Sequence, residues 1–206
     1  MKTHIVKLRG GSRGKYKFIA RQLVNGSVAA FPTDTVYGLG ADYLNAKAVS
    51  RIYRIKGRSK TKQLILMVGR RQDVFNVAEN VPPDVERLIK KYWPGPLTLI
   101  LNASLAVRLA TGKKTVGVRM PGCKELIEIL KQCPRPLATT SANISGGRSC
   151  CSFQEVKKLF DGKVDLIIDG GIAKHGKEST ILDVSAFPCN ILREGVIKKE
   201  ELAKYI

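Results

Sequence analysis

The sequence predicts an α/β fold, a single domain in which helices cover a mixed β-sheet. Segments with apolar residues at helical spacing and short apolar runs ending at Gly, Pro or Asn occur along the chain without strict alternation. The C-terminal part is rich in the short runs. This order favours a mixed sheet over a barrel or a regular dinucleotide-binding domain. A length of 206 residues without internal repeat or linker predicts one domain over residues 1–206.

Residues typical of turns and helix caps mark the ends of the expected helices and strands. Apolar residues between Phe18 and Val24 fall on one face of a helix that Gly26 can end. Residues 27–31 predict a short buried strand, 32–35 a polar turn, and 37–40 flexible backbone. The other expected strands are 63–68, 97–101, 115–120, 137–140, 165–168, 180–184 and 190–193; the other expected helices are 45–55, 82–92, 124–131, 153–160 and a short one from 198.

The charge balance points to anionic partners. The chain has 36 Lys and Arg against 17 Asp and Glu, which gives a formal net charge of +19. Residues 43–72 contain nine Lys or Arg and no acid. Charge of this density favours phosphate groups or nucleic acid. The N-terminus lacks the apolar run of a signal peptide, and no basic amphipathic helix is apparent. We therefore expect a cytoplasmic protein without a membrane partner.

Several kinds of site lack support in the sequence. The five cysteines form no CxxC pair and have no nearby histidine, so we expect reduced thiols and no metal held by protein side chains. Residues 171–177 have the spacing of a phosphate loop, but Glu178 stands where Ser or Thr would hold magnesium. GxGxxG and GxSxG are missing, and paired carboxylates are poorly supported because acids are sparse and scattered. The remaining chemistry depends on positioning and positive electrostatics, as in phosphoryl and nucleotidyl transfer.

Six polar clusters lie in expected turns or at strand ends. They are 33–35, 56–58, 115 with 119, 141–143, 179–180 and 193–195. Most of them could be only a turn, a cap or a solvated helix end. Arg119 is harder to explain in this way, because Val118 and Met120 flank it in an apolar strand. An inward guanidinium there needs an anionic partner, such as a carboxylate or a phosphate.

Apart from Thr115, the clusters fall within seven motifs that follow one another along the chain. These are PTDTVYGLG at 32–40, IKGR at 55–58, WPGPLT at 93–98, VGVRMP at 116–121, TSANISG at 140–146, STILD at 179–183 and ILREG at 191–195. The series resembles the YrdC/Sua5 family, the threonylcarbamoyl-AMP synthases, over about residues 15–200. Residues 58–62 and the loop with Cys150 resemble the short bacterial form, TsaC. The additional C-terminal domain of longer Sua5 proteins is not expected.

The resemblance implies a YrdC/RibB-like fold, a twisted mixed sheet with helices around a basic concave cavity. It implies an enzyme, a nucleotidyltransferase that makes L-threonylcarbamoyladenylate and pyrophosphate from L-threonine, bicarbonate and ATP. Mg²⁺ would accompany the ATP. Transferase proteins downstream would pass the threonylcarbamoyl group to adenosine 37 of ANN-reading tRNAs, which gives t6A.

Residue roles follow from the resemblance alone. On the ATP side it implies Lys56, Arg58, Lys62, Thr115, Asn143, Cys151 and Arg193. On the threonine side it implies Thr35, Arg119, Ser141 and Ser179, with Arg119 on the amino-acid carboxylate. Many relatives have Pro and Asn where this chain has Ser59 and Lys62, so a charge replaces an amide near the phosphates. Met67 stands where some relatives have a histidine, and no residue is assigned as a general acid or base.

Two alternatives stay open at this point. The first is a non-catalytic protein on the same fold that binds double-stranded RNA or tRNA, because +19 exceeds what one ATP requires. The second is an ATP-using paralogue with another acceptor amino acid. Pyrophosphate release that requires both threonine and bicarbonate would separate the synthase from both.

Overall fold

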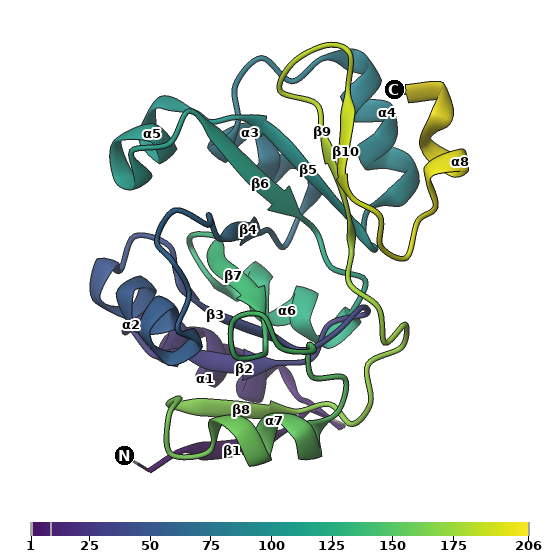
Figure 1. The fold of residues 1–206 in the computed structure, drawn as a ribbon. Coiled ribbons are helices and arrows are strands. Elements are labelled where there is room, and N and C mark those ends of the chain that lie inside the picture. The colour runs from purple at the N-terminus through teal and green to yellow at the C-terminus, as the bar shows by residue number, and fades with distance from the viewer. Residues whose placement is uncertain (1, 9, 206) are drawn as a thin grey trace.

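The computed structural model describes residues 2–8 and 10–205, in which helices surround one β-sheet (Figure 1). The strands are β1 His4–Lys7, β2 Ala29–Phe31, β3 Gly38–Asp42, β4 Ile65–Met67, β5 Leu97–Asn102, β6 Thr115–Arg119, β7 Leu137–Ser141, β8 Leu166–Asp169, β9 Thr180–Asp183 and β10 Asn190–Arg193. The α-helices are α1 Arg13–Val24, α2 Ala46–Lys56, α3 Val74–Val77, α4 Pro83–Tyr92, α5 Leu105–Thr111, α6 Lys124–Gln132, α7 Phe153–Phe160 and α8 Lys199–Leu202, with 3-10 turns at Arg71–Asp73 and Ala203–Tyr205.

The sheet joins strands from both ends of the chain. Its order is β1-β8-β2-β3-β7-β4-β6-β5-β9-β10, and in Figure 1 it runs from β1 and β8 at the bottom to β9 and β10 at the top. β8 pairs in parallel with β1 and β2, β4 with β6, and β5 with β9. The other neighbouring pairs are antiparallel. The predicted fold class, one α/β domain with a mixed sheet flanked by helices, is confirmed.

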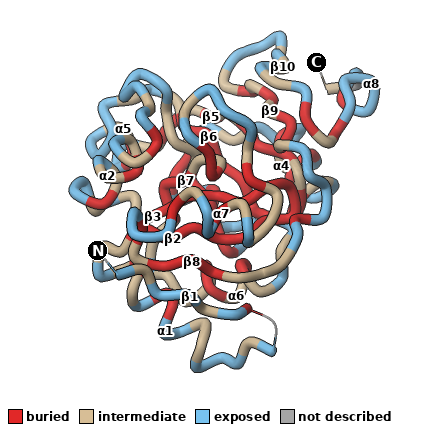
Figure 2. Tube along the Cα trace, turned by 60° about the horizontal axis from the view of Figure 1, so that its bottom comes forward, coloured by how far each residue is buried: buried red, intermediate tan, exposed pale blue. Residues whose placement is uncertain are grey.

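Three apolar clusters attach the helices to the sheet. One lies under α1 and α6 and includes Ile19 and Ile129. A second lies under α2 and α7 and includes Ile52 and Phe160. The third and largest joins α3, α4, α5 and α8 to β5 and β6 and includes the buried Trp93. Figure 2 shows these buried segments as red stretches inside a mostly pale-blue outer surface.

The sequence-based expectation for residues 37–40 is wrong, because β3 occupies most of this segment. Its two glycines serve close packing rather than flexibility. A Cβ on Gly40 would lie 2.8 Å from Cε1 of Phe31 and 2.9 Å from Cγ2 of Thr139. β3 therefore lies between β2 and β7 only because Gly40 has no side chain.

Other differences concern short elements. The sequence analysis predicted no strand at β1 and no helices at α3 and α5, and it placed β2 and β4 over longer ranges than the three residues each has. Helices α2, α4, α6 and α7 are confirmed to within one or two residues. No helix in residues 2–8 and 10–205 is long and apolar enough to cross a membrane.

Candidate active site

A cavity of about 210 Å³ lies where the 33–37 turn meets β4, β6, β7, β9 and β10. Six of the eleven predicted site residues line it, namely Thr35, Arg58, Arg119, Ser141, Ser179 and Arg193. The charged side chains among the described lining residues are the guanidinium groups of Arg58, Arg119 and Arg193 and the carboxylate of Glu178. Three cations against one anion make this a cavity for an anionic ligand.

Arg119 ends β6 at the floor of the cavity and is 3% exposed. Its Nη2 donates to Oδ1 of Asp34 at 2.6 Å, its Nη1 to Oγ1 of Thr35 at 2.8 Å, and its Nε to the Gly95 carbonyl at 3.0 Å. Burial lowers the pKa of Arg119, and the adjacent Asp34 carboxylate opposes this. The anionic partner expected from the sequence is thus Asp34. Because a guanidinium has five N–H donors, two remain for a ligand.

The two carboxylate oxygens of Asp34 differ in their hydrogen bonding. Oδ1 also accepts from the backbone N–H of Gly122 at 2.8 Å, whereas Oδ2 is buried without a hydrogen-bond partner among the described residues. Thr35 is oriented from the opposite side. The hydroxyl of Thr33 donates to the Val36 carbonyl at 2.6 Å, so the Thr35 hydroxyl donates to Thr33 over 2.9 Å. Arg119 and Thr35 are therefore held in one fixed arrangement before any ligand binds.

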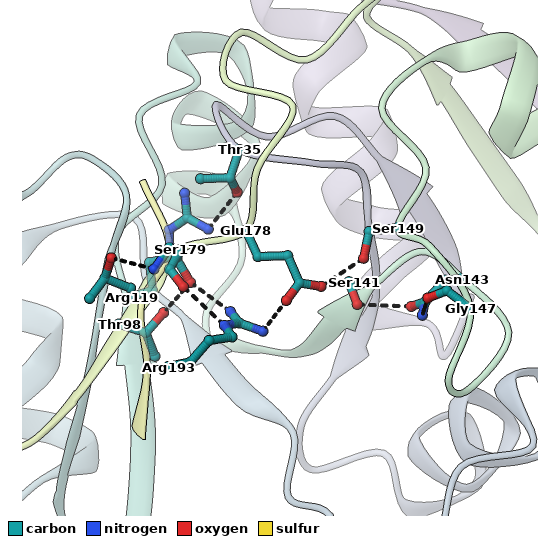
Figure 3. Close-up of polar contacts among 12 residues, drawn as sticks. Thr35, Thr98, Arg119, Ser141, Asn143, Gly147, Ser149, Glu178, Ser179 and Arg193 are labelled. Atoms are coloured by element: carbon teal, nitrogen blue, oxygen red, sulfur yellow. Dashed lines mark hydrogen bonds and ion pairs between the residues drawn. The ribbon is translucent and has the colours of Figure 1, made fainter. Parts of the chain in front are cut away.

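Arg193 and Ser179 form the second fixed group (Figure 3). Arg193 Nε donates to the Ser179 carbonyl at 3.1 Å, and Nη2 donates to Ser179 Oγ at 3.2 Å. Ser179 Oγ also lies 2.9 Å from the hydroxyl oxygen of Thr98 on β5. Arg193 Nη1 donates to Glu178 Oε2, and Glu178 Oε1 accepts from the Ser149 hydroxyl at 2.7 Å.

Lys56 is buried next to the cavity and does not line it. Its ammonium group donates to the Ser141 carbonyl at 2.5 Å, to the Asn143 carbonyl at 2.9 Å and to Asn143 Oδ1 at 2.6 Å. Burial, assisted by nearby Arg58, lowers the pKa of Lys56 to about 8. All three of its protons are used within the protein, so Lys56 organises the 141–143 segment.

Asn143 is fixed by the same interactions. The Ser141 hydroxyl donates to Asn143 Oδ1 at 2.8 Å, and Asn143 Nδ2 donates to the Gly147 carbonyl at 2.6 Å. Asn143 does not line the cavity, but it holds Ser141, which does. Lys56 and Asn143 thus act as one unit behind the wall of the cavity.

Arg58 reaches the cavity from the loop that follows α2. Its Nε donates to the Lys62 carbonyl at 3.1 Å and its Nη2 to the Gln63 carbonyl at 2.9 Å. Burial lowers the pKa of Arg58, while Tyr53 and Glu178 oppose this. Gly57 makes the turn possible, because its φ of 60° is left-handed.

The structure does not bring the remaining predicted residues to this cavity. Lys62 is exposed on the Arg58 loop. Thr115, at the start of β6, lines a separate cavity of about 470 Å³ between α2 and α5. Cys151 lies in the loop before α7, where its thiol faces the carbonyls of Ser149 and Gly176, and burial raises its pKa.

Sequence reasoning missed Glu178 as a site residue. It entered that reasoning only as the residue that spoils a phosphate loop. The available signal was its position immediately before Ser179, at the start of β9. An acid next to a predicted ligand-binding serine was therefore a candidate for the same cavity.

Fold and site together define a class of α/β protein in which a mixed sheet presents a cationic, preorganised cavity to an anionic ligand. Comparison with known proteins makes the class specific. The family model Sua5_yciO_yrdC, described as "Telomere recombination", matches residues 21–195. The chain belongs to the Sua5/YciO/YrdC family.

Relatives extend the match. A protein named threonylcarbamoyl-AMP synthase from Pyrococcus abyssi is 42% identical over 194 residues, which cover 93% of this chain and 57% of that protein. One of the same name from Bacillus subtilis is 37% identical over 190 residues, 91% of this chain and 55% of that protein. The chain thus spans a little over half the length of these curated relatives.

Solved structures agree. P. abyssi Sua5 complexed with L-threonine is similar at a TM-score of 0.92 and 39% identity, covering 100% of this chain and 61% of that one. E. coli YciO is similar at a TM-score of 0.86 and 26% identity, covering 98% of this chain and 99% of that one.

Proposed function

We propose that this protein is an L-threonylcarbamoyladenylate synthase, a nucleotidyltransferase that uses L-threonine, bicarbonate and ATP. The observation that carries the proposal is the cavity with three guanidinium groups, Arg58, Arg119 and Arg193, at positions matched by the family motifs. The names of relatives support it, as does the L-threonine bound to P. abyssi Sua5.

The reaction needs what the cavity supplies. The threonine amine takes up CO₂ derived from bicarbonate and loses a proton, which gives a carbamate. A carbamate oxygen then bonds to the α-phosphorus of ATP, the bond to the β-phosphate oxygen breaks, and pyrophosphate leaves. Both reactants are anions, so fixed cations must hold them together, and water must be kept from the labile carbamate.

We assign the residues that line the cavity to the two substrates. Arg119 has two free N–H donors for the threonine carboxylate, and Thr35, Ser141 and Ser179 supply hydroxyl groups around it. Arg58 and Arg193 would bind phosphates. Lys56 and Asn143 would act by fixing Ser141 rather than by touching ATP, and Lys62, Thr115 and Cys151 stay proposed as outer ATP contacts.

Mg²⁺ would arrive with the ATP. The described residues contain no cluster of three or more His, Cys, Asp or Glu that could hold a metal ion. This fits Mg²⁺, which commonly binds through substrate phosphates and few protein carboxylates. When bound, the ion would neutralise the charge that develops on the departing pyrophosphate.

The product would serve tRNA modification through the downstream t6A transferase proteins.

The proposed activity is tested by leaving out one substrate at a time. Pyrophosphate release from ATP should require both threonine and bicarbonate, and serine or valine should replace threonine poorly. Release that ignores threonine, or that prefers another amino acid, would contradict the proposal.

A further inference from the structure

Glu178 is the feature of the cavity that the proposed function leaves unexplained. Glu178 supplies the carboxylate among the described residues that line the cavity. The proposed phosphate ligands Arg58 and Arg193 line the same cavity. A fixed negative charge at this place repels a triphosphate. Its presence therefore needs a reason of its own.

The carboxylate bridges two segments that are distant in the sequence. One oxygen accepts from the Ser149 hydroxyl at 2.7 Å, in the loop between β7 and α7, and the other accepts from Nη1 of Arg193 on β10. Figure 3 shows Glu178 extended between these two partners. Glu178 thus occupies a guanidinium N–H of Arg193 for which a phosphate oxygen would compete.

The backbone of Glu178 is held in place from behind. The N–H of Val196 donates to the Glu178 carbonyl at 3.0 Å. Gly195 lies so close that a Cβ there would come within 2.1 Å of the same carbonyl oxygen. Any movement of Glu178 must therefore be a movement of its side chain, which is 31% exposed to solvent.

Glu178 also balances the cations around it. Its charge favours the protonated forms of Lys56 and Arg58, and so opposes the lowering of their pKa values by burial. Arg193 acts in the opposite direction on Arg58. A ligand-free cavity that contained only the guanidinium groups would be self-repelling, and Glu178 offsets this.

We propose that Glu178 is an internal anion that holds Arg193 in the ligand-free protein and is displaced from it by the triphosphate of ATP. The inference rests on the proposed function, which places ATP phosphates at Arg193. Because a phosphate oxygen competes with Glu178 for Nη1 of Arg193, the Glu178–Arg193 ion pair weakens nucleotide affinity. The same carboxylate can return to Arg193 as pyrophosphate leaves, which favours product release.

The test is the affinity of Glu178→Gln for ATP and for inorganic tripolyphosphate, measured by calorimetry with EDTA and again with Mg²⁺. Glutamine keeps the shape and carries no charge: its Oε1 can accept from Arg193, while its Nε2 can donate to the Ser149 hydroxyl. We expect both ligands to bind about tenfold more tightly than to the wild type, with and without Mg²⁺. Ser149→Ala, which removes one anchor of the carboxylate, should shift affinity in the same direction by a smaller factor.

Glu194→Gln is the matched control, since it changes the net charge equally but lies outside the cavity lining and pairs with Lys198. Equal tightening in this variant would overturn the inference, because it would show a general charge effect. Unchanged or weaker binding by Glu178→Gln would also overturn it, and weakening only with Mg²⁺ would make Glu178 a metal ligand instead. If tripolyphosphate binds more tightly to the variant while pyrophosphate release ignores threonine, the inference stands and the proposed function fails.

Discussion

At the scale of single residues, the candidate site depends on two buried cations with different tasks. Arg119 keeps two donors free for a ligand, whereas Lys56 uses all three of its protons on the 141–143 segment. The sequence could predict that both positions matter. It could not predict that Lys56 binds the 141–143 segment instead of lining the cavity, because its partners lie 85 and 87 residues further along the chain.

Lys56 should make the free energy of unfolding depend on pH in the alkaline range. Its folded pKa of about 8 lies below the ordinary value of 10.5, so between these values the unfolded chain binds more protons than the folded protein. The contribution of Lys56 to the free energy of unfolding therefore rises with pH across that window, by at most about 1.4 kcal/mol per pH unit. Urea unfolding between pH 7 and 10 measures this contribution as the difference in the free energy of unfolding between wild type and Lys56→Met. Parallel pH profiles would contradict the assignment.

Arg119 should be coupled to Asp34. Arg119→Met leaves a buried carboxylate without its cation, and we expect a loss of about 3–5 kcal/mol in the free energy of unfolding. The double variant Arg119→Met with Asp34→Asn removes that stranded charge and should recover a large part of the loss. A double-mutant cycle by chemical denaturation gives the coupling energy. Additive losses would show that the ion pair is not what stabilises this site.

Arg58 should matter for turnover and little for folding. Its partners are two backbone carbonyls of its own loop, so Arg58→Ala disturbs no distant segment. We expect pyrophosphate release to fall below detection while the circular-dichroism spectrum and melting temperature stay close to those of the wild type. Turnover at the wild-type rate would remove Arg58 from the phosphate site.

At the scale of elements, the longer amphipathic helices were predictable, whereas the glycine-containing strand β3 was not. Helices α4 and α7 carry their apolar residues at helical spacing and start with recognisable signals, Pro83 at the first position and the Ser152 capping box. β3 gave the opposite local signal, because Gly38 and Gly40 are poor strand residues. Pairing with β2 and β7 and close packing against Phe31 and Thr139 explain the strand, and these contacts are tertiary.

Gly195 should be the most sensitive glycine of the site. A Cβ at this position would lie 2.1 Å from the Glu178 carbonyl oxygen and 2.4 Å from the Ser179 carbonyl carbon, so Gly195→Ala must push β9 and the 195–196 segment apart. We expect a loss of about 2–3 kcal/mol in the free energy of unfolding, and weaker threonine binding.

Gly14→Ala is the control for that variant. Gly14 lies in the first turn of α1, and its nearest neighbour would be 3.8 Å from the new Cβ. This substitution should stabilise the protein by about 0.5–1 kcal/mol. Thermal unfolding that showed the two variants to be equally stable would contradict the packing argument for Gly195.

At the scale of the whole molecule, the charge exceeds what the cavity uses. The net charge is +19, and the acid-free stretch 43–72 includes exposed cations such as Lys47, Arg54 and Lys60 that the cavity does not involve. Composition predicted an anionic partner, and the three guanidinium groups that line the cavity fit such a partner. It could not predict which basic residues lie at a small phosphate site and which lie on the outer surface, because their positions depend on the fold.

The outer cations should bind tRNA through its phosphates. We expect tRNA affinity to fall by more than about tenfold between ~50 and ~200 mM salt, because each neutralised phosphate releases counterions. Lys47→Ser should reduce the slope of log affinity against log salt by about one if Lys47 contacts a phosphate. Filter binding over a salt series measures both, and a flat salt response would count against tRNA as a direct partner.

The central claim is that this cavity joins threonine, bicarbonate and ATP into one adenylate. Mass spectrometry of the product formed from threonine, ¹³C-labelled bicarbonate and ATP tests it most directly. The account predicts an adenylate that carries both the threonine and the label, formed in equal amount with pyrophosphate and lost in Arg58→Ala. Consumption of ATP with no labelled, threonine-containing adenylate would contradict it.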